Sequence, residues 1–343
     1  MNRHYRAVDR FQTGFTLIEL MIALVLGLVV IAGVLSVFLA GQQSYRTNQA
    51  LGNVQDSART AFELLARDIR GAGLTGCNNN GRMSNVINNN TSYWWADWSN
   101  ALHGYPDSAG ADPSTTTGSA AGQRVAGTDS IILLGTQGMG LSVASANNNG
   151  NNAANFKLNQ KTTELSDGNV IIVCDQDHAT MLQIVSYNDS NVTVVHNTGN
   201  AVSPGNCSKG LGYPPTCTTN GNQYSFGPNS EIAKLSAVDW YIGNNGSGTG
   251  AGTSLYRKNV SVGTTGASYS ADEMVRGVTK MSLGYHQASA AGFVAANLVT
   301  DWSKVDAVQM SLTVQSDDQT AGVAAKPLER TFTATTAVRN RVK

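Results

Sequence analysis

Two hydrophobic patterns follow each other near the start of the chain, and together they predict one long helix. Residues 15–40 form an apolar run of 26 residues that contains a single charged residue, Glu19. As a helix this run extends roughly 39 Å, enough to cross a hydrocarbon core of about 30 Å. Apolar residues then recur every three or four positions, which is the period of an amphipathic helix; they are Leu51, Val54, Ala58, Phe62, Leu65 and Ile69.

These patterns divide the predicted helix into a transmembrane half over residues 15–40 and an amphipathic half over residues 41–70. Arg59 with Glu63, and Glu63 with Arg67, have the four-residue spacing of ion pairs on its polar side. Gly71 and Gly73 mark its end. A separate second helix after a break at Gly41 or Gly52 is the alternative.

The rest of the chain, residues 71–343, carries the pattern of a β-rich globular domain. Short runs of β-branched residues are bounded by Asn, Asp and Gly. Within residues 305–315, Val308, Met310, Leu312 and Val314 fall on one face, which predicts a strand with one buried side. We expect an α+β fold in which the helix packs on a mostly antiparallel sheet with long loops. The predicted strands cover residues 130–134, 170–174, 181–187, 192–196, 233–242, 254–258, 275–285, 305–315 and 328–338.

Composition and motifs exclude several classes of function. Charged residues make up 13% of the chain and the net charge is zero, so no nucleic-acid-binding surface is expected. We find no nucleophile elbow, phosphate-binding loop or zinc-protease motif, and we expect no enzyme, cofactor or metal. The glycine-rich residues 246–250 fit a hairpin turn. The acidic residues Asp175, Asp177, Asp317 and Asp318 fit solvated turns better than Ca²⁺ loops.

The four cysteines, Cys77, Cys174, Cys207 and Cys217, follow the apolar run. An even number in an exported domain suggests disulfides, and four cysteines allow three pairings. Cys207 with Cys217 is favoured because the loop between them is short and rich in Gly, Pro and Thr, which leaves Cys77 with Cys174. Four buried free thiols are an alternative. A zinc site is less favoured because no C-x-x-C motif is present.

Arg3, Arg6 and Arg10 precede the apolar run and predict a cytoplasmic N-terminus with the remainder exported. The run is too long for the core of a cleaved signal peptide, which usually spans 7–15 residues. A plain signal anchor explains its length but leaves Glu19 unexplained, because a carboxylate inside a membrane helix is costly without a partner. Cleavage between Gly14 and Phe15 would free an amine that could serve as this partner.

The string Gly14-Phe15-Thr16-Leu17-Ile18-Glu19, placed between a basic leader and a long apolar run, resembles the class III prepilin signal of type IV pilins and type II secretion pseudopilins. The resemblance implies that residues 1–14 are a leader peptide. A prepilin peptidase would cut between Gly14 and Phe15 and N-methylate Phe15. Glu19 would pair with the N-terminal amine of an adjacent subunit during assembly.

Downstream motifs are similar to those of the PilW group of minor pilins. They are Val238-Asp239-Trp240-Tyr241-Ile242, Leu255-Tyr256-Arg257, Arg330-Thr331-Phe332 and Val338-Arg339-Asn340-Arg341. The resemblance implies a structural subunit of the bacterial inner membrane and pilus, with a periplasmic β domain. Its partners would be other minor pilins, the major pilin and the inner-membrane assembly machinery.

Two other functions stay open. One is a minor pseudopilin of a type II secretion system. The other is an adhesin or ligand-binding module at a pilus tip, to which the aromatic residues 93–98 could contribute. Such an aromatic cluster more often pins a loop to the core.

Overall fold

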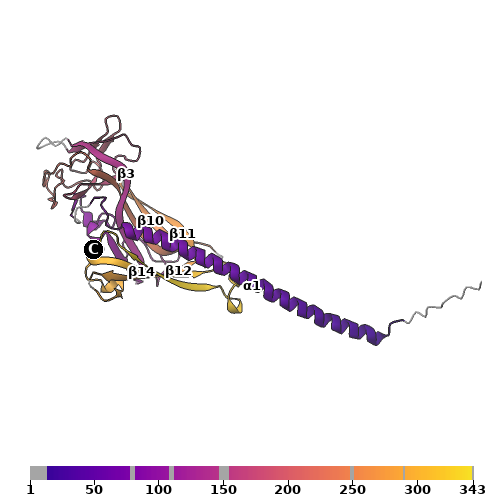
Figure 1. Cartoon of the computed structure of the whole chain (residues 1–343). Coiled ribbons are helices and arrows are strands. Elements are labelled where there is room, and N and C mark those ends of the chain that lie inside the picture. Colours follow the sequence, from indigo (N-terminus) through magenta and orange to yellow (C-terminus); the bar gives the residue numbers. More distant parts are fainter. Residues whose placement is uncertain are drawn as a thin grey trace, which may run out of the picture.

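The computed structural model describes residues 14–77, 82–107, 112–146, 154–247, 251–288 and 290–341. Its first element is the helix α1 (Leu17–Gly71), which is 55 residues long and continuous through Gly41 and Gly52. Figure 1 shows α1 projecting far beyond a β-rich domain that packs against its C-terminal half. The expected arrangement of a long N-terminal helix on a β domain is therefore confirmed. The arginines of the predicted leader lie outside the described residues.

The amphipathic half of α1 packs on the β domain through a stripe of mostly small side chains. Leu51 and Phe62, which belong to the predicted stripe, are only partly buried. Three further alanines join the stripe because small side chains let the helix approach the strands closely. Of the predicted ion pairs, Arg59 and Glu63 form one at 2.9 Å, whereas Arg67 pairs with Asp68. The buried residues of α1 are Ala50, Val54, Ala58, Ala61, Leu65, Ala66 and Ile69.

Within the described residues the strands form two sheets. All pairs are antiparallel except the parallel pair β1–β6. The larger sheet has the order β1 (Met83–Asn85), β6 (Ala179–Gln183), β5 (Val170–Cys174), β9 (Glu231–Asn244), β3 (Ser130–Ala146), β4 (Asn155–Leu158), β8 (Thr193–Val195) and β7 (Ser186–Asn188). Three strands branch from this path: β10 (Thr253–Gly263) beside β9, β11 (Gly266–Arg276) beside β10, and β2 (Leu102–Tyr105) beside β3.

The smaller sheet has the order β13 (Phe293–Val294), β12 (Val278–Gln287), β14 (Val305–Gln315) and β15 (Glu329–Ala337). Its second and third strands share a core with α1 and the larger sheet, so α1 is packed against both sheets. Short 3₁₀ turns connect the strands: η1 (Asn90–Ser92), η2 (Trp98–Asn100), η3 (Ala296–Leu298), η4 (Trp302–Lys304) and η5 (Val323–Ala325).

Several predicted strands coincide with observed ones, and others needed correction. Residues 170–174 and 305–315 match β5 and β14. The prediction of one strand over residues 275–285 is wrong, because Gly277 separates β11 from β12. Gly277 has a φ of +79°, and a Cβ at this position would lie 2.5 Å from the carbonyl oxygen of Gln315, so only glycine fits here. Residues 181–187 likewise divide between β6 and β7.

Candidate functional site: the N-terminal motif and the helix junction

The N-terminal motif forms a complete capping box at the start of α1. Thr16 is the N-cap residue, and its Oγ1 accepts a hydrogen bond from the backbone N–H of Glu19 at 3.4 Å. In return, Glu19 Oε2 accepts from the N–H and the hydroxyl of Thr16 at 3.0 and 2.9 Å. The carboxylate therefore satisfies the helix terminus of its own chain. We had not predicted this role for Thr16, although Thr-x-x-Glu ahead of an apolar run is its sequence signal.

Gly14 and Phe15 are exposed just before this cap, and a Cβ on Gly14 would meet no atom within 4 Å. Phe15 is 90% exposed. The bond between them is therefore open to an enzyme. Glu19 Oε1 accepts no hydrogen bond within the described residues, so one carboxylate oxygen stays free for a further donor.

Within the part of the chain that the structure describes, no residue of the apolar half of α1 is buried against the β domain. Its most hydrophobic 18-residue window has a mean hydropathy of 3.0 and none of it is buried. The large side chains from Leu17 to Leu39 are each more than half exposed. A bare apolar helix of this length is unstable in water and suited to a bilayer or to neighbouring helices.

The other end of α1 is fixed to the β domain through Asp68. Its Oδ2 accepts a hydrogen bond from Trp240 Nε1 at 3.0 Å and another from Arg257 Nε at 2.8 Å. Trp240 is fully buried, and the Arg257 guanidinium lies 5.9 Å from the centroid of its ring. The side chains of Asp68 and Arg257 are 13% and 20% exposed. Trp240 on β9 and Arg257 on β10 thus hold one carboxylate of the helix.

The last residues of the chain hold the end of α1 as well. The N–H of Arg339 donates to the carbonyl of Arg70 at 3.3 Å, and Asn340 Nδ2 donates to the carbonyl of Gly73 at 2.8 Å. Arg341 Nη1 donates to the carbonyl of Trp302 at 2.6 Å. Residues 339–341, which we call the C-terminal clasp, therefore hold the end of α1 and the turn that follows it.

Three of the four downstream motifs from which the resemblance was drawn thus meet near the end of α1, whereas Arg330-Thr331-Phe332 pairs with β14. Sequence reasoning singled out Trp240, Arg257, Asn340 and Arg341 but did not connect them to α1. It also missed Asp68. The only sequence signal for Asp68 is its position in the helix. It is an acidic residue next to the buried positions Leu65 and Ile69, where an apolar side chain is expected.

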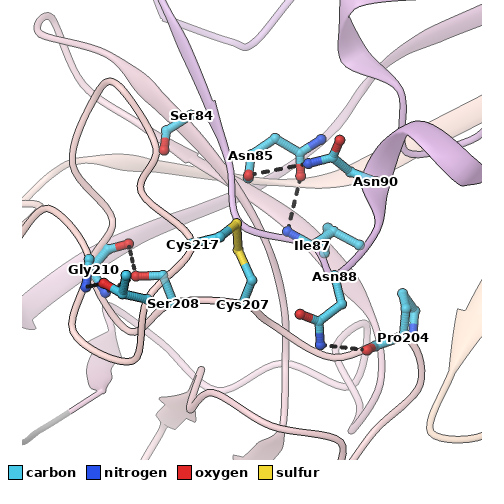
Figure 2. Close-up of a disulfide and its surroundings, with 12 residues drawn as sticks. Ser84, Asn85, Ile87, Asn88, Asn90, Pro204, Cys207, Ser208, Gly210 and Cys217 are labelled. Atoms are coloured by element: carbon cyan, nitrogen blue, oxygen red, sulfur yellow. Dashed lines mark hydrogen bonds between the residues drawn. A yellow bond between two sulfur atoms is a disulfide. The ribbon is translucent and has the colours of Figure 1, made fainter.

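The four cysteines form two disulfides, Cys77–Cys174 and Cys207–Cys217. The bonded cysteines are 97 and 10 residues apart in the sequence, respectively. The prediction that this domain contains disulfides is confirmed. Cys174 lies at the end of β5, so the first bond ties the segment after α1 to the larger sheet. Figure 2 shows the second bond beside Ile87, and the N–H of Cys207 donates to the carbonyl of Val86 at 2.8 Å. The disulfide closes the loop between Cys207 and Cys217, and the hydrogen bond attaches this loop to the segment after β1.

The acidic turns are occupied by protein partners. Asp175 Oδ1 accepts from the N–H of Asp177 at 2.8 Å, and its Oδ2 accepts from the hydroxyl of Tyr224 at 2.6 Å. Asp177 forms an ion pair with Arg82 and lies within hydrogen-bond distance of His178 Nδ1 at 2.8 Å. Asp318 pairs with Arg46. These contacts are typical of structured turns.

Two further candidates are the potential metal ligands and the glycine-rich stretch of residues 246–250. Among the described residues, one set of three potential metal ligands lies close together: Cys77, Cys174 and Glu231. Its two sulfur atoms are bonded to each other, which removes them as ligands. Residues 248–250 of the glycine-rich stretch lie outside the described residues.

The aromatic loop of residues 93–98 is pinned to the core. Trp95 is 1% exposed, and its ring centroid lies 5.3 Å from that of Tyr93. Trp94 stacks on Tyr269 of β11 at 6.0 Å. The cluster joins a core of residues from β3, β5 and β6. Most of the aromatic surface of this loop is therefore in contact with the core and holds the loop in place.

Two regions of the chain match models of known protein families. Residues 239–341 match the family model of the type IV pilus-assembly protein W, and residues 9–35 match the prokaryotic N-terminal methylation motif. The resemblance to PilW-type pilins is confirmed. The PilW match includes Trp240, Arg257 and the C-terminal clasp, so it covers the β-domain side of the helix junction. None of the curated proteins or solved structures matches the chain.

Both matches fit the geometry of the chain. The methylation motif covers Gly14, Phe15 and the capped start of α1. The apolar helix and this motif support membrane anchoring, with the β domain carried outside the bilayer. Together the two matches support a pilin-like protein related to type IV pilus assembly.

Proposed function

We propose that the chain is a minor pilin that joins other minor pilins in a complex that primes or caps a type IV pilus. A prepilin peptidase would remove residues 1–14 and methylate the amine of Phe15. The subunit would then be extracted from the inner membrane by the assembly machinery and meet the major pilin. The PilW match over residues 239–341 carries this proposal, because it favours a pilus over a secretion system.

The helix geometry supports an assembly role. A continuous helix, fixed at Asp68 and at the C-terminal clasp, transmits the position of the β domain to the apolar half as one rigid unit. That half presents an uncovered apolar surface on all sides, which neighbouring pilin helices could cover outside the bilayer. Subunit addition would therefore exchange lipid contacts for helix contacts.

Glu19 would link the membrane state to the assembled state. In the single chain its Oε2 caps α1, and its Oε1 accepts no hydrogen bond from the described residues. A methylated amine of Phe15 on a neighbouring subunit would be a cationic donor for this free oxygen, in a medium where an unpaired charge is costly. Pairing would also set the relative height of the two helices.

The proposed topology places the N-terminus in the cytoplasm and the β domain in the periplasm. The two disulfides support this placement, because such bonds persist in oxidising compartments. The β domain would reach the cell surface with the pilus and would support twitching motility or adhesion.

Mass spectrometry after co-expression with a prepilin peptidase tests the processing step. We expect a mature chain that begins with N-methylated Phe15, and an uncut chain when Gly14 is replaced by Leu. An N-terminus at any other residue would refute this part of the proposal. A deletion strain then separates the two systems: loss of surface pili supports the minor pilin, whereas loss of protein secretion with normal pili identifies a pseudopilin.

A further inference from the structure

One loop of the β domain reaches out to α1 just beyond its apolar half. This membrane-proximal loop, residues 316–328, connects β14 to β15. Figure 1 shows it in yellow against the middle of α1, at the end of the β domain nearest the projecting half of the helix. Ala321 and Leu328 are buried in a small cluster with Ala50. Its polar contacts with α1 are Gln43 Nε2 to the carbonyl of Thr320 at 3.1 Å, Thr47 Oγ1 to the carbonyl of Ala321 at 2.6 Å, and the Arg46–Asp318 ion pair at 3.2 Å.

These contacts set the height of the loop above the hydrocarbon. The apolar run ends at Ala40, and Gln43 follows three residues later. At about 1.5 Å per residue, Gln43 lies roughly 4.5 Å and Thr47 roughly 10 Å beyond the end of the run along the helix axis. The headgroup layer on each side of a bilayer is roughly 5–7 Å thick. A run of roughly 39 Å fits a core of about 30 Å when the helix tilts, which places Ala40 at the edge of the hydrocarbon. In that arrangement the base of the loop is level with the lipid headgroups or just above them.

The tip of the loop is apolar and exposed. Val323 is 91% exposed, more than any other large hydrophobic side chain in the described residues, and Ala324, Ala325 and Lys326 are exposed beside it. Scattered exposed apolar residues are common on soluble surfaces. Here, however, three follow one another in a loop whose base is level with the lipid headgroups. Lys326 is the only charged residue between positions 319 and 328.

The backbone of the tip is held in a defined shape. The N–H of Gly322 donates to the carbonyl of Lys326 at 2.8 Å, which closes the turn. A Cβ on Gly322 would lie 2.8 Å from that same oxygen, so glycine is required. Ala324 and Ala325 have φ values of 57° and 53°, in the left-handed region that non-glycine residues rarely adopt. The tip is thus a closed turn that keeps its apolar side chains outward.

We propose that residues 323–326 dock on the phospholipid headgroup layer of the membrane that α1 crosses. Val323, Ala324 and Ala325 rest between the headgroups, and the Lys326 ammonium contacts lipid phosphate. With α1 this gives the β domain a second point of contact, which fixes its tilt on the bilayer before assembly. The inference rests on membrane anchoring of α1 and does not depend on membership of a pilus.

Depth-dependent fluorescence quenching of the full chain in lipid nanodiscs tests this docking. All four native cysteines are in disulfides, so one introduced cysteine can be labelled with an environment-sensitive fluorophore. The test site is Val323→Cys. Ser190→Cys, on the exposed turn between β7 and β8, serves as the solvent control, and Val29→Cys in the apolar half serves as the deep control. Nitroxide lipids carry the quencher either on the headgroup or deep in the acyl chain.

We expect the headgroup quencher to act several-fold more strongly on the label at position 323 than at position 190. The deep quencher should act mainly at position 29. Equal quenching at positions 323 and 190 would overturn the proposal while leaving anchoring intact if position 29 responds. An unquenched label at position 29 would remove the anchoring itself and overturn the proposal as well.

The charge of the tip provides an independent readout. In nanodiscs that contain anionic lipid, Lys326→Glu in the Val323→Cys chain should reduce headgroup quenching, because it replaces attraction with repulsion. Lys161→Glu, at an exposed position elsewhere, is the matched control and should leave the quenching unchanged. An equal effect of both substitutions would contradict a specific role for Lys326. Protection of the tip only after other pilin subunits are added would assign it to a protein partner instead.

Discussion

Replacement of Asp68 by asparagine tests whether one carboxylate holds α1 on the β domain. The change keeps the shape of the side chain but removes the charge faced by Trp240 Nε1 and Arg257 Nε. A hydrogen bond to a charged group contributes about 1.5–3 kcal/mol, and breaking a buried ion pair costs about 3–5 kcal/mol. Because both charged side chains keep some contact with water and the amide oxygen still accepts one bond, we expect a loss of about 2–3 kcal/mol.

Urea unfolding of the full chain in detergent micelles measures this loss. All five tryptophans lie in the β domain, so their fluorescence reports its unfolding. Asp56→Asn is the matched control, since Asp56 is exposed on the same helix; it should change the free energy of unfolding by less than about 0.5 kcal/mol. A double-mutant cycle with Arg257→Gln should show coupling between positions 68 and 257. Equal effects of Asp68→Asn and Asp56→Asn would refute the anchoring role.

Four further outcomes are expected. Leu65→Ala, at a fully buried position of α1, should lower the free energy of unfolding by about 2–5 kcal/mol in the same urea assay. Replacing both Cys77 and Cys174 by serine should cost up to about 4.7 kcal/mol for a closed loop of this length, and a smaller loss than for the 10-residue disulfide would contradict the chain-entropy account. Burial lowers the pKa of His196 to about 4, below its unfolded value of about 6.5. The unfolded chain therefore binds the proton first, and the stability present above about pH 6.5 should fall as the pH drops toward 4; His196→Phe should show a shallower fall in thermal melts across this window. Glu19→Ala should leave membrane insertion intact but reduce the number of pili counted by electron microscopy, and a normal count would contradict amine pairing.

The local sequence pattern predicted the bounds of some strands but not of others. Residues 170–174 and 305–315 were predicted with the observed bounds because continuous or alternating apolar residues and flanking turn residues agree there. β3 was predicted only over residues 130–134, yet it extends to Ala146. The part of β3 beyond Leu134 contains Gly135, Gly138 and Gly140, and glycine has a low strand propensity. Pairing with β9, including a bulge between Gly138 and Leu141, stabilises this half as a strand.

The sequence by itself determined the long helix, the N-terminal methylation motif and the β-rich character of the remainder. These features depend on residues that are neighbours in the chain, such as the apolar period of α1 and the Thr16–Glu19 capping box. The tertiary structure alone decided what those elements contact. Asp68 meets Arg257 across 189 residues, and Thr47 meets Ala321 across 274. Such contacts arise from the packing of complete elements, and no local period along the chain encodes them.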